Sequence, residues 1–354
     1  MKGAMKTIFP HIMVLAVMLA CCRPVNDAAG ASEPPVRVLR HLAMATELEF
    51  LLYGADADTD PESLLAAGRE AFAAVDALEQ RISSWRADSW TSLMNRSAAE
   101  RPVAVGGDVF ELMMHAKRFH ETTQGAFDVT VGPLLALWGF YGNSGDRPDE
   151  QTLKQVLEYV GLQYVTFDTE ARTVFYERPG MRVDFGGIGK GMALDRAAAV
   201  LEENGIRSAR LSIGTSTLVA LGAPPGRTGW KLDIRSPYNT EEDAPIATVI
   251  IRDESLSTSS ASERYVEIDG RRYSHIIDPR TGMPAASGVS SATAIAPTGM
   301  ESDALSTAFL VMGLEATRAY CEAHPHVRAI LAVEDGDAAE TVYINFSNDG
   351  LKEQ

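Results

Sequence analysis

Hydrophobic and polar residues follow the helical period in some stretches of the chain and the strand period in others. The longest helical pattern begins at Asp60-Pro61-Glu62 and ends near Ile82, and proline is favoured early in a helix because its fixed φ suits the first turn. A second helix is predicted at 109–122, with Asp108 as its capping residue. Similar patterns predict helices at 153–160, 193–204, 302–313 and 314–323.

Short hydrophobic runs of strand length fill much of the remaining chain. Because these runs are not separated by regularly spaced helices, we predict an α+β fold with mainly antiparallel sheets and packed helices. The predicted strands cover 48–53, 164–168, 173–177, 208–213, 218–221, 230–234, 246–251, 265–268, 289–296, 328–333 and 341–344.

The first 22 residues have the pattern of a targeting segment. Lys2 and Lys6 precede a hydrophobic run from Ile8 to Ala20, which is too short and too broken to span a bilayer stably. The run ends at Cys21 in a sequence that resembles a bacterial lipobox, and a reading one residue later makes Cys22 the acylated residue. A plain secretory signal is the alternative, and in both cases we expect the rest of the chain to be exported.

The segment 23–37 is rich in Ala, Pro, Gly and Ser and is predicted to be a flexible tether. Residues 38–348 would then form a single catalytic domain, since a chain of 354 residues can bury one large core or two intimate lobes. The net charge of −16 argues against nucleic acid as a partner. A phosphate ligand would need local help from a metal, a lysine or backbone N–H groups.

Three motifs carry candidate chemistry. Glycines surround Lys190 in Asp184–Gly191, which suits either a phosphate-binding loop or a tight structural turn. Asp303 and Thr307 share a helix face and offer oxygen ligands to Mg²⁺, although a capping aspartate and a core threonine are the commoner use. His275 precedes a turn-forming segment and is a candidate base, although it could simply belong to a hairpin strand.

A fourth motif is the aromatic segment 125–140. Its glycine, phenylalanine and tryptophan residues are typical of a buried strand and turn. The same aromatic side chains could stack on a flavin or adenine ring.

Taken in this order along the chain, the motifs closely resemble those of the ApbE family of FAD:protein FMN transferases, from about Met44 to Val333. The most specific matches are Phe127–Thr130 with Trp138, Asp184–Gly191 with Asp195, His275 with Asp278–Gly282, and Asp303 with Thr307.

The resemblance implies two intimate lobes with a flavin site between them, and Mg²⁺-dependent transfer of FMN from FAD to a Thr or Ser hydroxyl of an acceptor protein, with release of AMP. It places His275 near the reacting phosphate, and we predict His275 as the catalytic base and Lys190 as a catalytic residue that stabilises charge on the phosphates. The metal would be held by the Gly189 carbonyl and the side chains of Asp303 and Thr307. The implied cofactor contacts are Met44, Trp85, Ala126, Phe127, Asp128, Gly186, Met192 and His275.

The chain departs from the family pattern at three places. Ala45 stands where a glycine is common, and Gly189 stands where an alanine is usual. Gly214-Thr215-Ser216 replaces a Gly-Gly-Asn, so the amide side chain is lost and no role is predicted for this segment.

The resemblance leaves other functions open. An FAD pyrophosphatase would use water in place of the protein hydroxyl, and a lipoprotein that only binds FAD or is purely structural would need no metal at the pyrophosphate. We expect a lipoprotein on the periplasmic side of a bacterial membrane, with the inner membrane favoured. The acceptors would be exported or membrane-associated redox proteins that carry a short motif containing Thr.

Overall fold

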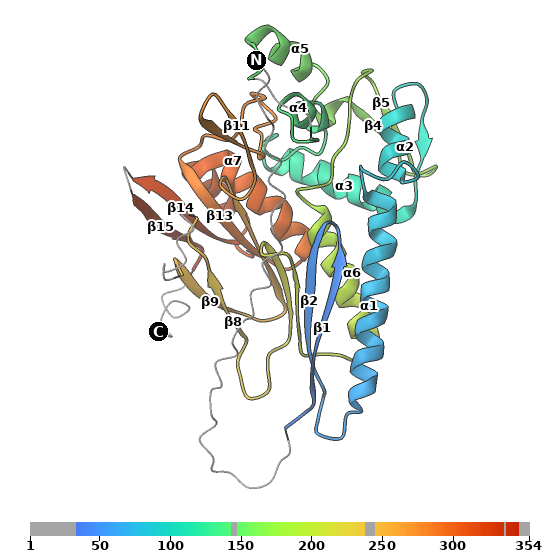
Figure 1. Cartoon of the computed structure of the whole chain (residues 1–354), viewed down its shortest axis with the longest axis vertical. Helices are drawn as coiled ribbons and strands as arrows, with labels where there is room; N and C mark the ends of the chain where they lie inside the picture. The colour runs from blue at the N-terminus through green and yellow to red at the C-terminus, as the bar shows by residue number, and fades with distance from the viewer. Residues whose placement is uncertain (1–32, 143–146, 238–244, 336–337, 347–354) are drawn as a thin grey trace, which may run out of the picture. The chain divides into compact units, whose positions relative to one another are not determined.

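An eight-stranded antiparallel sheet forms the largest layer of the computed structural model, which describes residues 33–142, 147–237, 245–335 and 338–346 (Figure 1). Its strand order is β1-β2-β6-β7-β10-β13-β14-β15. The α+β prediction with mainly antiparallel sheets is confirmed. The strands are β1 (Val36–Ala43), β2 (Thr46–Tyr53), β6 (Ala209–Ile213), β7 (Thr217–Leu221), β10 (Glu254–Ser260), β13 (Val289–Ala296), β14 (Arg328–Asp335) and β15 (Ala338–Ile344).

Both faces of the central strands are covered. On one face α7 (Gly299–Ala323) packs against β10 and β13, and α6 (Gly189–Glu203) lies between α7 and α1 (Pro61–Ile82). On the other face the hairpin of β8 (Trp230–Ile234) and β9 (Ala247–Ile251) contributes to a second hydrophobic cluster with the sheet. Every residue of β13 is therefore buried.

A smaller, mostly helical region lies beside this sheet (Figure 1). Trp138 and Phe140 anchor a separate hydrophobic cluster there, which includes Ile268 of β11 and so joins the helical region to the β11–β12 hairpin. The elements are α2 (Trp90–Ser97), β3 (Val103–Ala104), α3 (Gly107–Thr122), α4 (Gly132–Leu137), α5 (Glu150–Leu157), a 3₁₀ turn (Leu162–Tyr164), β4 (Val165–Asp168), β5 (Thr173–Tyr176), β11 (Tyr265–Ile268) and β12 (Arg271–Ser274).

Helix α1 forms as its sequence predicts. The Asp60 carboxylate accepts the N–H of Glu62, and Pro61 occupies the first turn. The buried positions recur every three or four residues, which places one hydrophobic stripe against α6 and the sheet. This stripe consists of Leu64, Ala67, Gly68, Ala71, Phe72, Val75, Leu78 and Ile82.

The predicted division between helices 302–313 and 314–323 corresponds to a break inside α7. Gly313 has φ +78°, which is not helical. The Ser287 hydroxyl donates to the Leu310 carbonyl at 2.6 Å, so a carbonyl that the break frees from the helix is satisfied by a side chain.

The structure corrects the predicted start of several elements. Strand β1 begins at Val36, so the predicted tether at 23–37 is too long. Helix α3 begins at Gly107, which places Asp108 in its first turn, where it pairs with Arg81 instead of capping the helix. Helix α5 begins at Glu150, where the Asp149 side chain accepts the N–H of Thr152.

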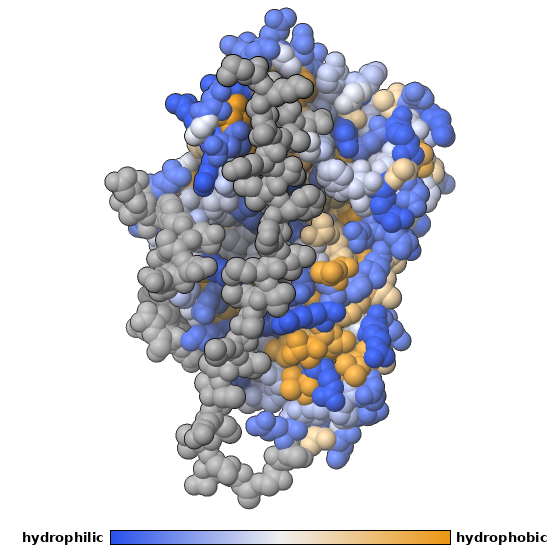
Figure 2. Space-filling model, in the orientation of Figure 1, coloured by the Kyte–Doolittle hydropathy of each residue, from blue (hydrophilic) through white to orange (hydrophobic). Residues whose placement is uncertain are grey.

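The outer face of β1 carries exposed hydrophobic side chains. Val36, Val38 and Leu42 alternate along it, with exposed fractions of 42%, 56% and 76%. Figure 2 shows hydrophobic residues gathered on the face that carries β1 and β2. No helix among the described residues is long and hydrophobic enough to cross a membrane. The predicted targeting segment, including Cys21 and Cys22, lies outside the described residues.

Candidate functional site

A cavity of about 820 Å³ opens where the β1–β2 turn, the end of α1, the glycine-rich loop and the start of α7 meet. This volume lies within the range of roughly 300–1,000 Å³ that is usual for small-molecule and cofactor sites. Most of the site residues predicted from the sequence line this one cavity. They are Met44, Trp85, Ala126, Phe127, Asp128, Gly186, Lys190, His275, Asp303 and Thr307.

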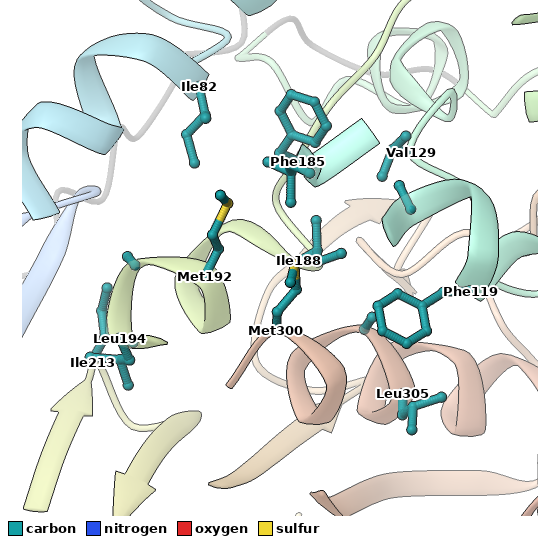
Figure 3. Packing of buried hydrophobic residues seen from close by; sticks show 14 of the residues in the cluster. Ile82, Phe119, Val129, Phe185, Ile188, Met192, Leu194, Ile213, Met300 and Leu305 are labelled. Carbon is teal, nitrogen blue, oxygen red and sulfur yellow. The ribbon is translucent and has the colours of Figure 1, made fainter. Parts of the chain in front are cut away.

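Gly189 and Met192 are not among the described residues that line the cavity, so their predicted metal and FAD contacts stay predictions. Met192 is buried, and Figure 3 shows it directed towards Ile82 in the packed core beside the site. Phe185, Ile188 and Met300 complete this part of the core in the same view. The hydrophobic packing holds the ends of α1, α6 and α7 together under the cavity.

The turn between β1 and β2 reaches the cavity in a strained conformation. Met44 and Ala45 have φ of 52° and 60°, a left-handed region that residues with a Cβ rarely adopt. A glycine at position 45 would adopt this conformation without strain. The side chain of Met44 extends to within 3.5 Å of a Cβ built on Gly189, so the turn contacts the start of α6.

The glycine-rich segment is shorter as a loop than the sequence predicts, because α6 already begins at Gly189. Its Gly191 N–H donates to the Asp303 carboxylate at 2.9 Å, so this part of the helix N-terminus is occupied by a protein group. A Cβ on Gly191 would lie 2.0 Å from the Gly299 carbonyl, and glycine is therefore required where α6 and α7 cross.

Asp184 organises the rim of the cavity. One of its oxygens accepts the hydroxyls of Ser84 and Tyr141, and the other accepts the Gly186 N–H. Trp85 is 68% exposed and packs edge-on against Tyr141, with ring centroids 5.4 Å apart. The aromatic rim is thus partly open to solvent. Sequence reasoning missed Tyr141, although it directly follows the aromatic segment 125–140.

Asp128 lines the cavity but is engaged by the protein. Its carboxylate accepts the N–H and the hydroxyl of Thr130 and the N–H of Leu162. His120 forms an ion pair with it at 3.0 Å. Burial lowers the pKa of His120, but the Asp128 carboxylate outweighs this effect and the net pKa is raised. The structure therefore gives Asp128 a role in shaping the loop, beside its predicted contact with FAD.

His275 has its tautomer set by the protein. Its Nδ1 lies 2.9 Å from the backbone carbonyl of Arg264, which can only accept, so Nδ1 carries the proton. Nε2 then keeps its lone pair and can act as a base. Burial, followed by the charges of Arg264 and Lys190, lowers the pKa of His275, and these effects outweigh the groups that raise it.

Asp303 is a buried carboxylate with unused hydrogen-bonding capacity. Its Oδ2 accepts the Gly191 N–H, and within the described residues its Oδ1 has only a long contact of 3.4 Å to the Thr217 hydroxyl. Burial raises the pKa of Asp303, and Lys190 opposes this effect. A carboxylate so placed fits a cation as its partner.

Thr307 lies one helical turn after Asp303. A Cβ on Gly187 would approach its hydroxyl to 3.3 Å, so glycine at this position leaves more room beside that oxygen. Among the described residues there is no group of three or more His, Cys, Asp or Glu side chains that could hold a metal. A cation at Asp303 and Thr307 would therefore depend on hydroxyl, backbone, water and substrate oxygens, as Mg²⁺ commonly does.

Ser216, for which the sequence predicts no role, contacts Lys190. The ammonium of Lys190 donates to the Ser216 hydroxyl, which also lies 3.4 Å from the Thr217 hydroxyl. Thr217 in turn reaches Asp303. A hydroxyl at this position thus links the predicted phosphate-binding lysine to the predicted metal ligand.

Comparison with known proteins gives a consistent result. The model of the ApbE family matches residues 44–331. A protein of Klebsiella pneumoniae (strain 342) named FAD:protein FMN transferase is 32% identical over 309 residues, which cover 85% of this chain and 87% of that protein. The protein of the same name from Escherichia coli K12 is 29% identical over 343 residues, with coverage of 95% and 96%.

Solved structures agree with these relatives. The ApbE protein from Thermotoga maritima superimposes with a TM-score of 0.79 at 28% identity, covering 90% of this chain and all of that one. The flavin transferase ApbE from Vibrio cholerae gives a TM-score of 0.74 at 27% identity, covering 88% and 97%.

Proposed function

This chain belongs to the ApbE family, and from that premise we propose that it is an FAD:protein FMN transferase. The observation that carries the proposal is the presence of His275, Lys190, Asp303 and Thr307 on one cavity of suitable size. A base, a cation and oxygen ligands for a metal are the groups that phosphoryl transfer requires.

In the proposed reaction, the hydroxyl of an acceptor Thr or Ser gives its proton to Nε2 of His275. The hydroxyl oxygen bonds to the phosphorus of the FMN half of FAD, and the bond from that phosphorus to the bridging oxygen breaks. AMP leaves with the electron pair of that bond. Lys190 places a positive charge beside the oxygens on which negative charge accumulates, and Ser216 holds its ammonium.

We propose Mg²⁺ as the metal, held by Asp303, Thr307 and the Gly189 carbonyl. When bound, it supplies positive charge to the pyrophosphate oxygens and lowers the cost of breaking that bond. Asp303 supports this assignment because it is buried and its Oδ1 has only a weak partner among the residues that the structure describes.

The test is an incubation of the purified full chain with FAD and Mg²⁺, with and without a peptide that contains Thr. Transfer predicts AMP release matched by an FMN-sized mass gain on the peptide. His275→Asn should lose both signals, whereas His326→Asn, a change at a half-exposed histidine outside the cavity lining, should keep them. Free FMN with AMP would instead indicate a pyrophosphatase, and FAD binding without AMP would indicate a binding protein.

We also propose that the chain is an exported lipoprotein that acts on exported redox proteins with a Thr-containing motif. The support is the basic and hydrophobic N-terminal pattern before Cys21 and Cys22. Mass spectrometry of the mature N-terminus in Cys21→Ser and Cys22→Ser variants would identify the acylated residue. An unmodified N-terminus in the parent protein would reject the lipid anchor.

A further inference from the structure

Hydroxyl side chains form a row between β10 and α7. Ser255, Ser257 and Ser259 alternate along β10 and share the face that contacts the helix. On α7, Ser302 lies 2.8 Å from Ser255 and 3.1 Å from Ser257. Such a row is unusual at a place where hydrophobic residues would normally pack.

The two ends of this row differ in their surroundings. Ser255, Ser257 and Ser302 are fully buried. Ser259 lines the cavity, as Asp303 and Thr307 do, and its hydroxyl lies 3.3 Å from that of Thr307. Of the serines in this row, Ser259 is therefore the one that lies beside the candidate metal site at Asp303 and Thr307.

The available acceptors determine where the hydroxyl protons point. The Asp303 carbonyl accepts the helical N–H of Thr307 and, at 3.0 Å, the hydroxyl of Ser306, so both of its lone pairs already have donors. The Thr307 hydroxyl also lies 3.4 Å from this carbonyl, which makes it a third and more distant donor. The Ser259 hydroxyl lies 2.9 Å from that of Ser306 and can donate to it. Of the two acceptors within reach of the Thr307 hydroxyl, Ser259 is the nearer and the Asp303 carbonyl already has two donors. This arrangement favours protons that run from Thr307 to Ser259, to Ser306 and to the Asp303 carbonyl.

We infer that Ser259 is a positioning residue that accepts the Thr307 O–H and so leaves a lone pair of the Thr307 oxygen free to face a divalent cation. A hydroxyl binds a cation through a lone pair, and a proton pointed at the site would repel it. The inference rests on the proposed function, which places Mg²⁺ at Asp303 and Thr307. Partners behind metal ligands of this kind commonly change metal affinity about 10- to 100-fold.

The test measures binding of Mn²⁺, a cation that suits the same oxygen ligands as Mg²⁺, to the full chain by the EPR signal of the free ion. Ser259→Ala should weaken Mn²⁺ binding by about tenfold or more. Ser259→Thr keeps the hydroxyl and should bind as the parent does. Ser257→Ala is the matched control, because Ser302 keeps its bonds to Ser255 and to the Gly299 carbonyl.

Unchanged Mn²⁺ affinity in Ser259→Ala would overturn the inference, as would equal weakening by Ser257→Ala or a parent protein that binds no Mn²⁺. If Ser259→Ala melts at a lower temperature, Ser259→Cys, whose sulfur is a poor acceptor, should still weaken Mn²⁺ binding. Failure of the proposed function would appear separately, as a parent protein that binds Mn²⁺ but releases no AMP from FAD.

Discussion

Asp195 and Asp303 occupy reciprocal positions at the adjoining ends of two packed helices. Asp195 on α6 accepts the N–H groups of Gly299 and Met300 at the start of α7, at 2.6 and 2.8 Å. Asp303 on α7 accepts the Gly191 N–H near the start of α6 at 2.9 Å. Each carboxylate thus satisfies backbone donors that the other helix leaves unpaired.

Asp195 and Asp303 differ in what their second carboxylate oxygen contacts. Both oxygens of Asp195 hold backbone N–H groups, and the residue is not among the described residues that line the cavity. Asp303 uses one oxygen in this way. Its other oxygen lies beside the cavity and has a single long contact, of 3.4 Å, with the described part of the chain. The same capping arrangement therefore serves two purposes. At Asp195, where both carboxylate oxygens accept backbone N–H groups, it holds two helices together. At Asp303, where one oxygen has no strong partner among the described residues, it also offers a ligand to the cavity.

The largest expected effect is loss of activity in Asp303→Asn. The amide keeps an acceptor for the Gly191 N–H but removes the negative charge, so the rate of AMP release should fall by about 10²–10³ or more. Stability at pH 7 should not fall, because burial already raises the pKa of Asp303 and disfavours its charge. AMP assays and urea unfolding measure the two effects. A variant with parental activity would contradict the metal assignment.

The next expected effect concerns the pH dependence of the rate. Burial first, then Arg264 and Lys190, lower the pKa of His275 below its ordinary 6.5. A base must be neutral, so kcat/KM should stay level as the pH falls through 6.5 and then drop about tenfold per pH unit below the lowered pKa. His326→Asn should keep this profile. A rate that already declines above pH 6.5 would show that His275 is not the base.

A smaller effect is expected from Asp195→Ala, which leaves two N–H groups of α7 unpaired. The free energy of unfolding should fall by about 1–3 kcal/mol. Urea unfolding measures it, with Asp88→Ala, a change at a largely exposed aspartate, as the control. A loss no larger than in the control would mean that Asp195 does not hold the start of α7.

Asp195 also predicts a pH dependence of stability. Burial raises its pKa from 3.8 to about 6, so the folded state binds the proton more tightly than the unfolded state does. The stability that comes from binding this proton is therefore full below about pH 4 and is lost as the pH rises through about 6, whereas the hydrogen bonds to Gly299 and Met300 remain. Asp195→Asn should remove this slope from the unfolding free energy, and a slope identical to the parent would refute the assignment.

The smallest effect is expected from Ala45→Gly at the cavity rim. Ala45 has φ +60°, and glycine relieves that strain at some cost in chain entropy, so stability should rise by about 0.5–1 kcal/mol. Ala43→Gly, in strand β1, should instead lower stability by a similar amount. Thermal or urea unfolding measures both variants. A loss of stability in Ala45→Gly would show that the turn is not strained.

Elements with a clear hydrophobic period were predictable from the sequence. Helix α1, strand β13 and the break at Gly313 follow from local patterns. Strand β10 was missed because its buried face carries serines, which are satisfied by hydroxyls of α7 that lie about 45 residues later in the chain. Helix α4 was taken for a strand and turn, since its short apolar sequence fits either structure.

The sequence by itself determined the α+β class, the family and a set of site residues most of which line the cavity, because these depend on local periodicity and on motifs whose order is preserved along the chain. Only the tertiary structure decided which of the predicted residues have unused hydrogen-bonding capacity. Whether Asp128 and Asp303 are satisfied, which nitrogen of His275 carries the proton and what Ser216 and Ser259 contact all depend on groups brought together by folding. Hydrogen bonds form between neighbours in space, and the packing of α6, α7 and the sheet determines those neighbours.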